Sequence, residues 1–484
     1  MLKRIGAEEG GEFKAVASGT LPSGKPVIVN ADGTVSVVSE TSATQAQGTA
    51  VAFESADTTF TASTFDSNSN KVVIAYKDKG NSNYGTAVVG TVDSSDNSIS
   101  FGTPVVFESA NTTEIAATFD SNSNKVVIAY SDEGNSGHGN AIIGTVSGTD
   151  ISFGSAVVFE SAETSEISCV FDTNSNKVVI AYRDQGNNNY GTAIVGTVSG
   201  TSISFGTVVV FNSGQTKFTS TVFDSTNNKV VIAYEDDANS DYGTAIVGTV
   251  SGTGISFGSA TVFLEASVNY VSAAYDTDAQ KVVVSINNNS NNYGKAIVGT
   301  VSGTSISFGS VVTFASASTL YGRIVYDPVA KKVVIAYADG GDSDKGTLIV
   351  GTVSGTSISF GSEVVYEVGK SPNISITYDS NSERVVIAYS DQNNSDYGTA
   401  IVSQTGFTST NITSENYIGI SSSGAADGTT AIIDTKGAIA DNLSSLTPGQ
   451  SYFVQTDGTL GTTADDPSVF AGTAIAATKL IVKG

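Results

Sequence analysis

The chain has 484 residues, and its 23 Lys and Arg residues against 47 Asp and Glu residues give a formal net charge of -24. A chain this acidic has no electrostatic means of holding a phosphate backbone, so we exclude nucleic acid and anionic membrane as partners. One Cys, one His and no Trp exclude a disulfide framework, a thiolate metal cage and a multi-histidine metal site. We therefore predict a globular chain without a cofactor.

The segment before residue 47 does not share the pattern of the rest of the chain. Its start, MLKRIGAEEGGEF, lacks the apolar stretch of a secretory signal. No apolar run in the chain reaches the roughly 18 residues of a membrane span, so we expect a soluble chain without membrane insertion. Residues 19–38, GTLPSGKPVIVNADGTVSVV, predict a strand, an Asp-Gly turn and a second strand.

A repeat of about 52 residues dominates the chain. The segment KVVIAY, or a close variant of it, begins at Lys71, Lys125, Lys177, Lys229, Lys281, Lys332 and Arg384. Each copy contains short runs rich in Val, Ile, Phe, Tyr and Thr, separated by Asn, Asp, Ser and Gly, which predicts four antiparallel strands. Strand A ends in FD or YD, strand B is KVVIAY, strand C is GTAIVGTV and strand D is SFGSAVVFE.

The two ends of the repeat predict how the copies are arranged. The seventh copy stops after strand C, whereas residues 47–56, QGTAVAFESA, resemble a strand D that precedes the first copy. An open solenoid would leave two unpaired edges, while a ring closed by the N-terminal strand pairs both. The sequence therefore predicts an all-β fold, with a seven-bladed β-propeller over residues 47–405.

Residues 406–484 again lie outside the repeat. They contain SLTPGQSYFVQTDGTLGTT, which has the same order of Pro, Gly, apolar strand and Asp-Gly-Thr as the segment 1–46. Ring closure brings both ends of the chain near one blade. We therefore expect the two segments to form one small β module, which we interpret as an attachment piece.

Two acidic positions recur in every copy or nearly so. The Asp that ends strand A has a metal-binding interpretation and a favoured structural one, in which it fixes the A–B hairpin by accepting backbone N–H bonds. This first set is Asp66, Asp120, Asp172, Asp224, Asp276, Asp327 and Asp379. The second set opens the loop between strands B and C, and consists of Asp78, Asp132, Asp184, Asp236, Asn288, Asp339 and Asp391.

Propeller geometry places the B–C and D–A loops on one face, which we call the loop face. There the second acidic set would form an acidic rim with Glu54, Glu108 and Glu160, which we expect in D–A loops. Oxygen ligands of this kind suit Ca²⁺, although no single loop has the density of a calcium-binding loop. Solvated turns are the favoured interpretation, and no metal is predicted.

An aromatic residue closes the same B–C loop in most copies. These positions are Tyr84, Tyr190, Tyr242, Tyr293 and Tyr397, with His138 and Lys345 in the remaining copies. Tyrosine beside Asn, Asp and Ser is typical of sugar recognition, because the ring supplies an apolar platform and the polar groups bind hydroxyls. The alternative is that these side chains only pack at the start of strand C. We take the tyrosines and His138, with the neighbouring Asp residues, as the candidate ligand-binding set.

The residues give little support for catalysis. A sialidase-like site needs several converging arginines, but the chain has only Arg4, Arg183, Arg323 and Arg384, of which Arg323 alone lies on an inner strand. Cys169 lies in a strand among apolar residues, as a buried structural Cys does. His138 has no nucleophile motif near it. A paired-carboxylate glycosidase stays open, yet no pair stands out from the repeat.

One resemblance follows from the C-terminal residues. The stretch ENYIGISSSGAADGTTAIIDTKGAIADNLSSLTPGQSYFVQTDGTL and the closing DPSVFAGTAIAATKLIVKG resemble a C-terminal module in virion structural proteins of marine tailed bacteriophages, notably those of cyanobacteria. The repeats, such as FDSNSNKVVIAYSDEGNSGHG, are similar to repeats that precede this module. The resemblance implies a virion component of the tail fibre or head appendage type and transfers no catalytic residue.

The leading hypothesis is thus a non-enzymatic virion structural protein, made in the host cytoplasm, whose propeller touches host surface glycan. Its expected partners are other virion proteins and a glycan, with homo-oligomerisation through the terminal module. A second hypothesis is a virion-associated glycan-processing enzyme. A third is a capsid or tail decoration protein without a receptor role.

Overall fold

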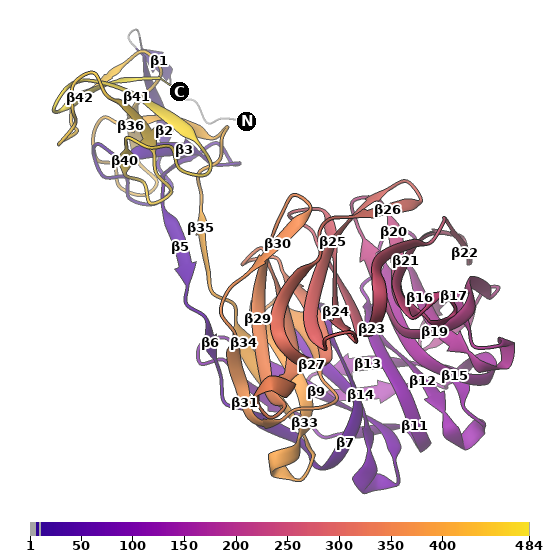
Figure 1. Ribbon diagram of the computed structural model, residues 1–484. Helices are drawn as coiled ribbons and strands as arrows, with labels where there is room; N and C mark the ends of the chain where they lie inside the picture. The colour runs from indigo at the N-terminus through magenta and orange to yellow at the C-terminus, as the bar shows by residue number, and fades with distance from the viewer. Residues whose placement is uncertain (1–5, 9–10, 484) are drawn as a thin grey trace. The chain divides into compact units, whose positions relative to one another are not determined.

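The recurring element of the structure is a long strand that belongs to two sheets at once. The computed structural model describes residues 6–8 and 11–483, so Arg4 lies outside the described residues. In one copy, the first half of β15 (Val157–Asp172) pairs with β13 (His138–Ser147), and its second half pairs with β16 (Lys177–Asp184) of the following sheet. This strand therefore ties each sheet to the next (Figure 1).

The same elements recur in each copy. The long strands are β7 (Val51–Asp66), β11 (Val105–Asp120), β15, β19 (Val209–Asp224), β23 (Thr261–Asp276) and β27 (Val312–Asp327), and in the last copy β31 (Val364–Lys370) and β32 (Ser375–Asp379). The KVVIAY strands are β8 (Lys71–Asp78), β12 (Lys125–Asp132), β16, β20 (Lys229–Asp236), β24 (Lys281–Asn288), β28 (Lys332–Asp339) and β33 (Arg384–Asp391). They are followed by β9 (Tyr84–Asp93), β13, β17 (Tyr190–Ser199), β21 (Tyr242–Ser251), β25 (Tyr293–Ser302), β29 (Lys345–Ser354) and β34 (Tyr397–Gln404). The short outer strands are β10 (Ser98–Phe101), β14 (Asp150–Phe153), β18 (Ser202–Phe205), β22 (Gly254–Phe257), β26 (Ser305–Phe308) and β30 (Ser357–Phe360).

Short 3-10 turns connect the KVVIAY strands to the strands that follow them. They are η1 (Lys79–Asn81), η2 (Glu133–Asn135), η3 (Gln185–Asn187), η4 (Asp237–Asn239), η5 (Gly340–Asp342) and η6 (Gln392–Asn394). Among the described residues, no helix has the length and the apolar character that a membrane crossing requires.

The predicted strand D and the predicted D–A loop are both wrong in detail. Strand D is divided, because β14 pairs with the second half of β13 and β15 with the first half. The chain then continues through β15 into the next sheet without a loop. Register shifts at three points of β15 give the strand the bend that a loop would otherwise supply. Glu54, Glu108 and Glu160 accordingly lie within long strands.

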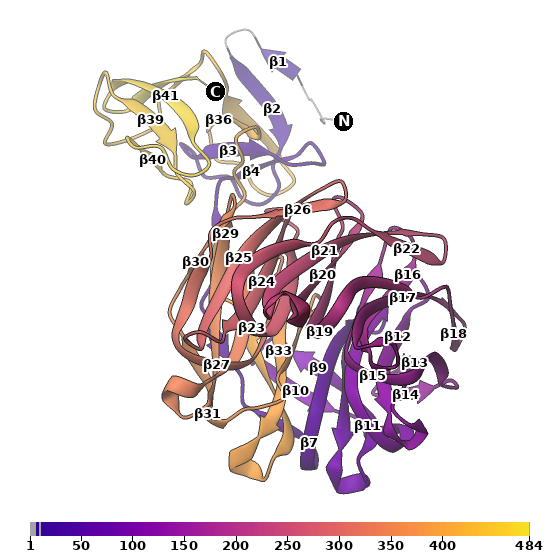
Figure 2. The same cartoon turned by 45° about the vertical axis from the view of Figure 1, so that its right-hand side comes forward.

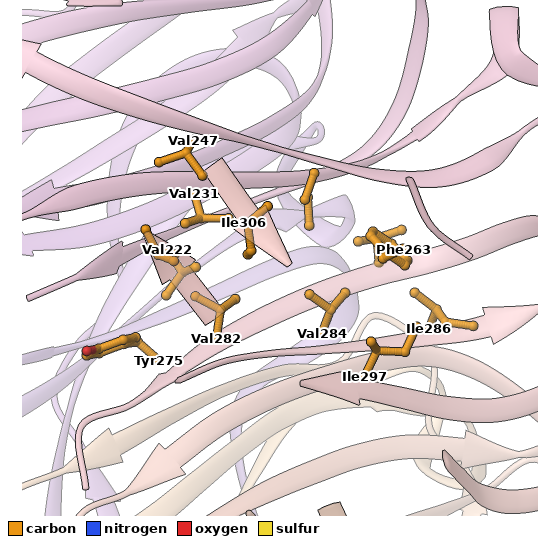
Figure 3. Close-up of a cluster of buried hydrophobic side chains, with 14 of the residues drawn as sticks. Val222, Val231, Val247, Phe263, Tyr275, Val282, Val284, Ile286, Ile297 and Ile306 are labelled. Atoms are coloured by element: carbon orange, nitrogen blue, oxygen red, sulfur yellow. The ribbon is translucent and has the colours of Figure 1, made fainter. Parts of the chain in front are cut away.

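The hydrophobic core lies between successive sheets. The KVVIAY strands are buried on both faces: Val231 and Ala233 of β20 pack toward the following sheet, and Ile232 and Tyr234 toward the preceding one. Figure 3 shows the first of these interfaces, where Val231 lies near Val282 of β24. Because both faces of the strand are covered, the segment is almost continuously apolar instead of alternating with polar residues.

The N-terminal strand pairs with the last copy. Strand β34 pairs with β7 through Tyr397–Asp57 and Gly398–Glu54, and β6 (Ala46–Gln47) pairs with the end of β34. The pairing of β13 with β15 has the same register, with His138–Glu163 and Gly139–Glu160. Figure 1 shows β6 and β34, in indigo and orange, next to each other, and Figure 2 shows the orange strands of the last copy beside β7.

The chain divides into two compact units, Gln45–Thr405 and a second unit of Met1–Thr44 with Gly406–Gly484. In the second unit the two ends of the chain share one sheet, since β2 pairs with β37 and β3 with β36. Its strands are β1 (Gly6–Glu8), β2 (Glu12–Val16), β3 (Pro26–Val29), β4 (Val35–Val37), β5 (Glu40–Ala43), β35 (Phe407–Thr410), β36 (Tyr417–Ser421), β37 (Thr430–Asp434), β38 (Ile439–Ala440), β39 (Ser451–Val454), β40 (Leu460–Gly461), β41 (Val469–Ala476) and β42 (Lys479–Val482). This pairing is the association that the shared residue order of the two segments predicts.

Candidate functional site

The Asp that ends each inner strand is a structural residue. In β15, Asp172 is 2% exposed, and its Oδ1 accepts hydrogen bonds from the backbone N–H groups of Asn174 (2.9 Å) and Ser175 (3.0 Å). The same pair of bonds forms at Asp66, Asp120, Asp224, Asp276, Asp327 and Asp379. The interpretation that this Asp fixes the A–B hairpin is therefore confirmed.

The second acidic set caps the turns that follow the KVVIAY strands. The side chain of Asp78 accepts the N–H of Asn81, that of Asp132 the N–H of Gly134, and that of Asp184 the N–H of Asn187. Asp391 caps η6 in the same way. Asp236 makes no such cap, and its Oδ1 instead accepts a bond of 3.1 Å from the Asn212 amide. These carboxylates thus have a role within their own turns.

The glutamates of the predicted rim bind buried tyrosines. Glu54 accepts the hydroxyl of Tyr76 at 3.0 Å, and Glu108 and Glu160 accept those of Tyr130 and Tyr182. These tyrosines are fully buried, and burial raises the pKa of each hydroxyl above its ordinary value. The pairs therefore satisfy polar groups inside the sheets.

The loop-face aromatic residues have a different environment. Each stands opposite an Asp or Asn of the second acidic set in the strand pairing, as Tyr84 opposite Asp78 and Tyr190 opposite Asp184. The pairs continue with His138–Asp132, Tyr242–Asp236, Tyr293–Asn288, Lys345–Asp339 and Tyr397–Asp391. The aromatic side chains are half-buried, and among the described residues no tyrosine of this set bonds through its hydroxyl. The His138 Nδ1 lies 3.0 Å from the Asn135 amide.

The structure also contains a central cavity that the sequence did not reveal. Its wall is the second halves of β7, β11, β15, β19, β23 and β27 together with β32, which follow one another around it. The cavity volume is about 450 Å³. One residue of each copy faces it with a positive φ of 49 to 56°, and we call this set the inner ring: Phe60, Glu114, Glu166, Phe218, Tyr270, Tyr321 and Asn373.

Neighbouring members of the inner ring contact each other. The Glu114 carboxylate accepts the N–H of Glu166 at 2.7 Å, and the Glu166 carboxylate accepts the N–H of Phe218 at 2.8 Å. The ring centroids of Phe218 and Tyr270 lie 5.6 Å apart, and those of Tyr270 and Tyr321 lie 5.2 Å apart. The cavity therefore has an acidic side and an aromatic side.

The charges that line the cavity are perturbed by burial. Burial, followed by the charge of Glu166, raises the pKa of Glu114 from 4.5 to about 7, and burial also raises the pKa of Glu166. Arg323 projects into the same space, where desolvation lowers the pKa of its guanidinium. Cys169 is partly buried and lines the cavity, where desolvation raises the pKa of its thiol to about 12.

Comparison of the copies provides the signal that could have located this cavity. The KVVIAY segment hardly changes, whereas the inner-ring position carries Phe, Glu, Tyr or Asn. Positions that build every sheet need the same residue in each copy, whereas positions that face the cavity can differ between copies. Of the other arginines in the described residues, Arg384 bonds to Asn97. Arg183 bonds to Ser165, and its positive charge lowers the pKa of Glu114 and of Glu166 against the effect of burial.

A further acidic cluster lies beside the cavity wall, at Glu235, Asp237 and Asp241. The Lys217 ammonium contacts all three carboxylates, at 3.0, 2.8 and 3.5 Å respectively. A lysine thus occupies the position that a metal ion would need, and the cluster is a network of ion pairs.

Stability is expected to fall as pH rises from about 5 to about 8, because Glu114 holds a proton in the folded chain that the unfolded chain releases. This stabilisation is present below the ordinary pKa of 4.5 and is lost as pH passes about 7. Glu235, whose pKa burial also raises to about 7, contributes with the same sign. Glu114→Gln should flatten the pH dependence of the unfolding free energy, measured by urea unfolding at several pH values, by at most about 1.4 kcal/mol per pH unit. An unchanged slope in this variant would contradict the assignment.

Comparison with known proteins defines the fold class. No protein-family model matches the sequence, and no curated protein matches it. A lectin from Burkholderia pseudomallei is similar in structure, with a TM-score of 0.53, 10% identity, and coverage of 74% of this chain and 98% of the lectin. A mutant of AofleA from Arthrobotrys oligospora has a TM-score of 0.43 and 10% identity, covering 71% of this chain and 96% of AofleA. The periplasmic gluconolactonase PpgL from Pseudomonas aeruginosa has a TM-score of 0.47 and 11% identity, covering 64% and 86%.

The likeness to the lectin concerns the fold alone, since only 10% of the residues are identical. Together with the repeated four-stranded sheets, it places the chain among all-β proteins of the β-propeller class. The predicted fold class is confirmed at this level.

Proposed function

We propose that this chain is a non-enzymatic virion structural protein of a tailed bacteriophage, and that its propeller binds host surface glycan through the loop face. The virion role rests on the resemblance of residues 415–484. The glycan-binding role rests on the set of half-buried tyrosines whose hydroxyls are free. The tyrosines that serve the sheets, such as Tyr76, are fully buried and bond through their hydroxyls to glutamates. The loop-face tyrosines are instead only half-buried and have an unused hydroxyl donor, and an accessible aromatic ring with a free donor suits sugar binding.

We also propose that Gln45–Thr405 is a seven-bladed propeller closed by its N-terminal strand. The register of β34 with β7, which reproduces that of β13 with β15, supports this arrangement. Both ends of the unit, at β6 and at the end of β34, lie at the ends of strands away from the B–C turns. The loop face thus carries neither chain end, which suits a surface displayed for binding. The second unit then serves for attachment to other virion proteins and for homo-oligomerisation.

The test is binding of the full-length protein to host cells and to a glycan array. The double variant Tyr190→Ala with Tyr242→Ala removes two aromatic platforms and is expected to bind at least about tenfold more weakly. A tenfold loss corresponds to about 1.4 kcal/mol of binding free energy. The matched double variant Tyr190→Phe with Tyr242→Phe keeps both aromatic rings and should lose less binding affinity. Failure of the folded wild type to bind any glycan or cell would overturn the glycan role and favour the decoration hypothesis. Wild-type binding by the Ala variant would exclude the loop-face site.

An enzymatic alternative has one specific observation in its favour. Glu114 and Glu166 lie on neighbouring strands in the cavity, and a pKa of about 7 at Glu114 suits a general acid. Against it, each carboxylate accepts a backbone N–H of the next strand, so both already hold the inner ring together. Release of sugar from a bound glycan by the wild type, abolished in Glu114→Gln, would establish the enzyme.

A further inference from the structure

Arg323 occupies a position where the other copies carry only small residues. It stands opposite Ala336 in the strand pairing, and the equivalent residues, which also line the cavity, are Ala62, Ala116, Ser168, Ser220, Ser272 and Ser375. A guanidinium on a long side chain at this position has no room within the wall. It therefore extends into the space that the small residues leave open.

The guanidinium of Arg323 makes no close ion pair among the described residues, although the charges of Glu166 and Glu114 act on it. Its one hydrogen bond is from Nη1 to the carbonyl of the adjacent Gly322 at 3.0 Å, and within the described residues no carboxylate lies within 4.0 Å of it. Arg323 is accessible to solvent at the cavity surface, and the surrounding wall still desolvates its guanidinium enough to lower the pKa. A guanidinium carries five donors in a planar fork that matches a carboxylate, and here nearly all of them are free.

The rest of the wall complements this cation. The strands that carry Glu114 and Glu166 are separated from β27 by two inner strands on either side, so both glutamates face Arg323 across the cavity. The rings of Tyr270 and Tyr321, whose centroids lie 5.2 Å apart, line the same cavity as the arginine. The cavity thus offers a fork for an anion, oxygen acceptors for hydroxyls on the opposite wall, and an aromatic surface.

We propose that the central cavity is a second ligand site, which takes an acidic sugar residue with its carboxylate on Arg323 and its hydroxyls directed to Glu114 and Glu166. A sugar ring has an apolar face for Tyr270 and Tyr321, and a volume of about 450 Å³ lies within the range of small-molecule sites. A neutral sugar lacks the group that Arg323 selects, and a simple anion lacks the hydroxyls. This site goes beyond the loop-face function and does not depend on it.

The test compares acidic with neutral sugars on the full-length protein by isothermal titration calorimetry. D-galacturonate and D-glucuronate are the probes, with D-galactose and D-glucose as their neutral counterparts. Arg323→Ser installs the residue that Ser272 and Ser375 already represent at equivalent positions, so the fold is expected to persist. Lys295→Thr is the matched control, because it removes one positive charge from β25, outside the cavity, and restores the Thr of equivalent strands such as β21.

We expect at least one acidic probe to bind ten times or more tightly than its neutral counterpart, and Arg323→Ser to lose that binding. The Lys295→Thr control should bind as the wild type does. Absence of acidic-sugar binding by the folded wild type, equal binding of the neutral sugar, or unchanged binding by Arg323→Ser would each overturn the proposal. The loop-face variant with Ala at positions 190 and 242 should retain acidic-sugar binding, which separates failure of this site from failure of the loop face.

Discussion

Gly154→Ala is expected to destabilise the protein by roughly 1–3 kcal/mol, because the added methyl group overpacks a closed interface. Gly154 lies between β14 and β15, and a Cβ there would meet the carbonyl oxygen of Thr201, in the hairpin of the next sheet, at less than 3.0 Å. Thr201 lies in the turn between β17 and β18, so the backbone of that hairpin would have to shift to make room. Urea unfolding of the purified variant would measure the loss.

The repeat supplies a matched control for this substitution. Gly361 is the equivalent residue before the last copy, which lacks the hairpin, and the nearest atom to its added Cβ is the Val350 carbonyl oxygen at 3.8 Å. Gly361→Ala should therefore change stability by no more than about 0.5 kcal/mol. Equal losses at both positions would show that packing against the hairpin is not the cause.

The same experiment at Gly48 examines the proposed closure of the ring. A Cβ on Gly48 would meet the carbonyl oxygen of Asn97 as closely as one on Gly154 meets Thr201. If the N-terminal strand completes the last blade in solution, Gly48→Ala should cost as much as Gly154→Ala. A neutral result at Gly48 beside a large loss at Gly154 would argue for an open arrangement.

Asp172→Ala is the second substitution expected to have a large effect, a loss of about 2–4 kcal/mol. It removes a buried acceptor and leaves the N–H groups of Asn174 and Ser175 without their partner. Asp172→Asn keeps an acceptor oxygen and should lose less unfolding free energy. Asp150→Ala, at an exposed position at the start of β14, is the control and should stay within about 0.5 kcal/mol. Thermal unfolding of the three variants would check the order, and an equal loss in all three would contradict the role of the hairpin bonds.

The elements that local chemistry specifies could be predicted from the residues. Asp172 and its equivalents were assigned to the hairpin because an Asp before Asn and Ser accepts nearby N–H groups wherever the chain turns. The prediction of a loop between strands D and A was wrong. A continuous strand with bulges around Glu160 has the same residue pattern as two strands joined by a polar connection, so the sequence does not distinguish them. Whether a polar stretch turns or only bends depends on the sheet that follows it.

The cavity residues show the limit of prediction from one copy at a time. Glu114, Glu166 and Arg323 lie in strands whose other positions agree with the repeat, so no local motif marks them. Their relation arises only when the inner strands assemble around one space. The differences between copies point to these positions, but not to which of them face each other.

The sequence by itself determined the all-β character of the chain, its repeat of about 52 residues, and the hairpins fixed by an Asp. These features follow from contacts between residues close together in the chain, which composition and periodicity report. Only the tertiary structure decided that the long strands cross between sheets, that Gly48 packs where Gly154 and its equivalents do, and that Arg323 faces two glutamates across a cavity. The physical reason is that residues one or more repeats apart meet only after the sheets have packed.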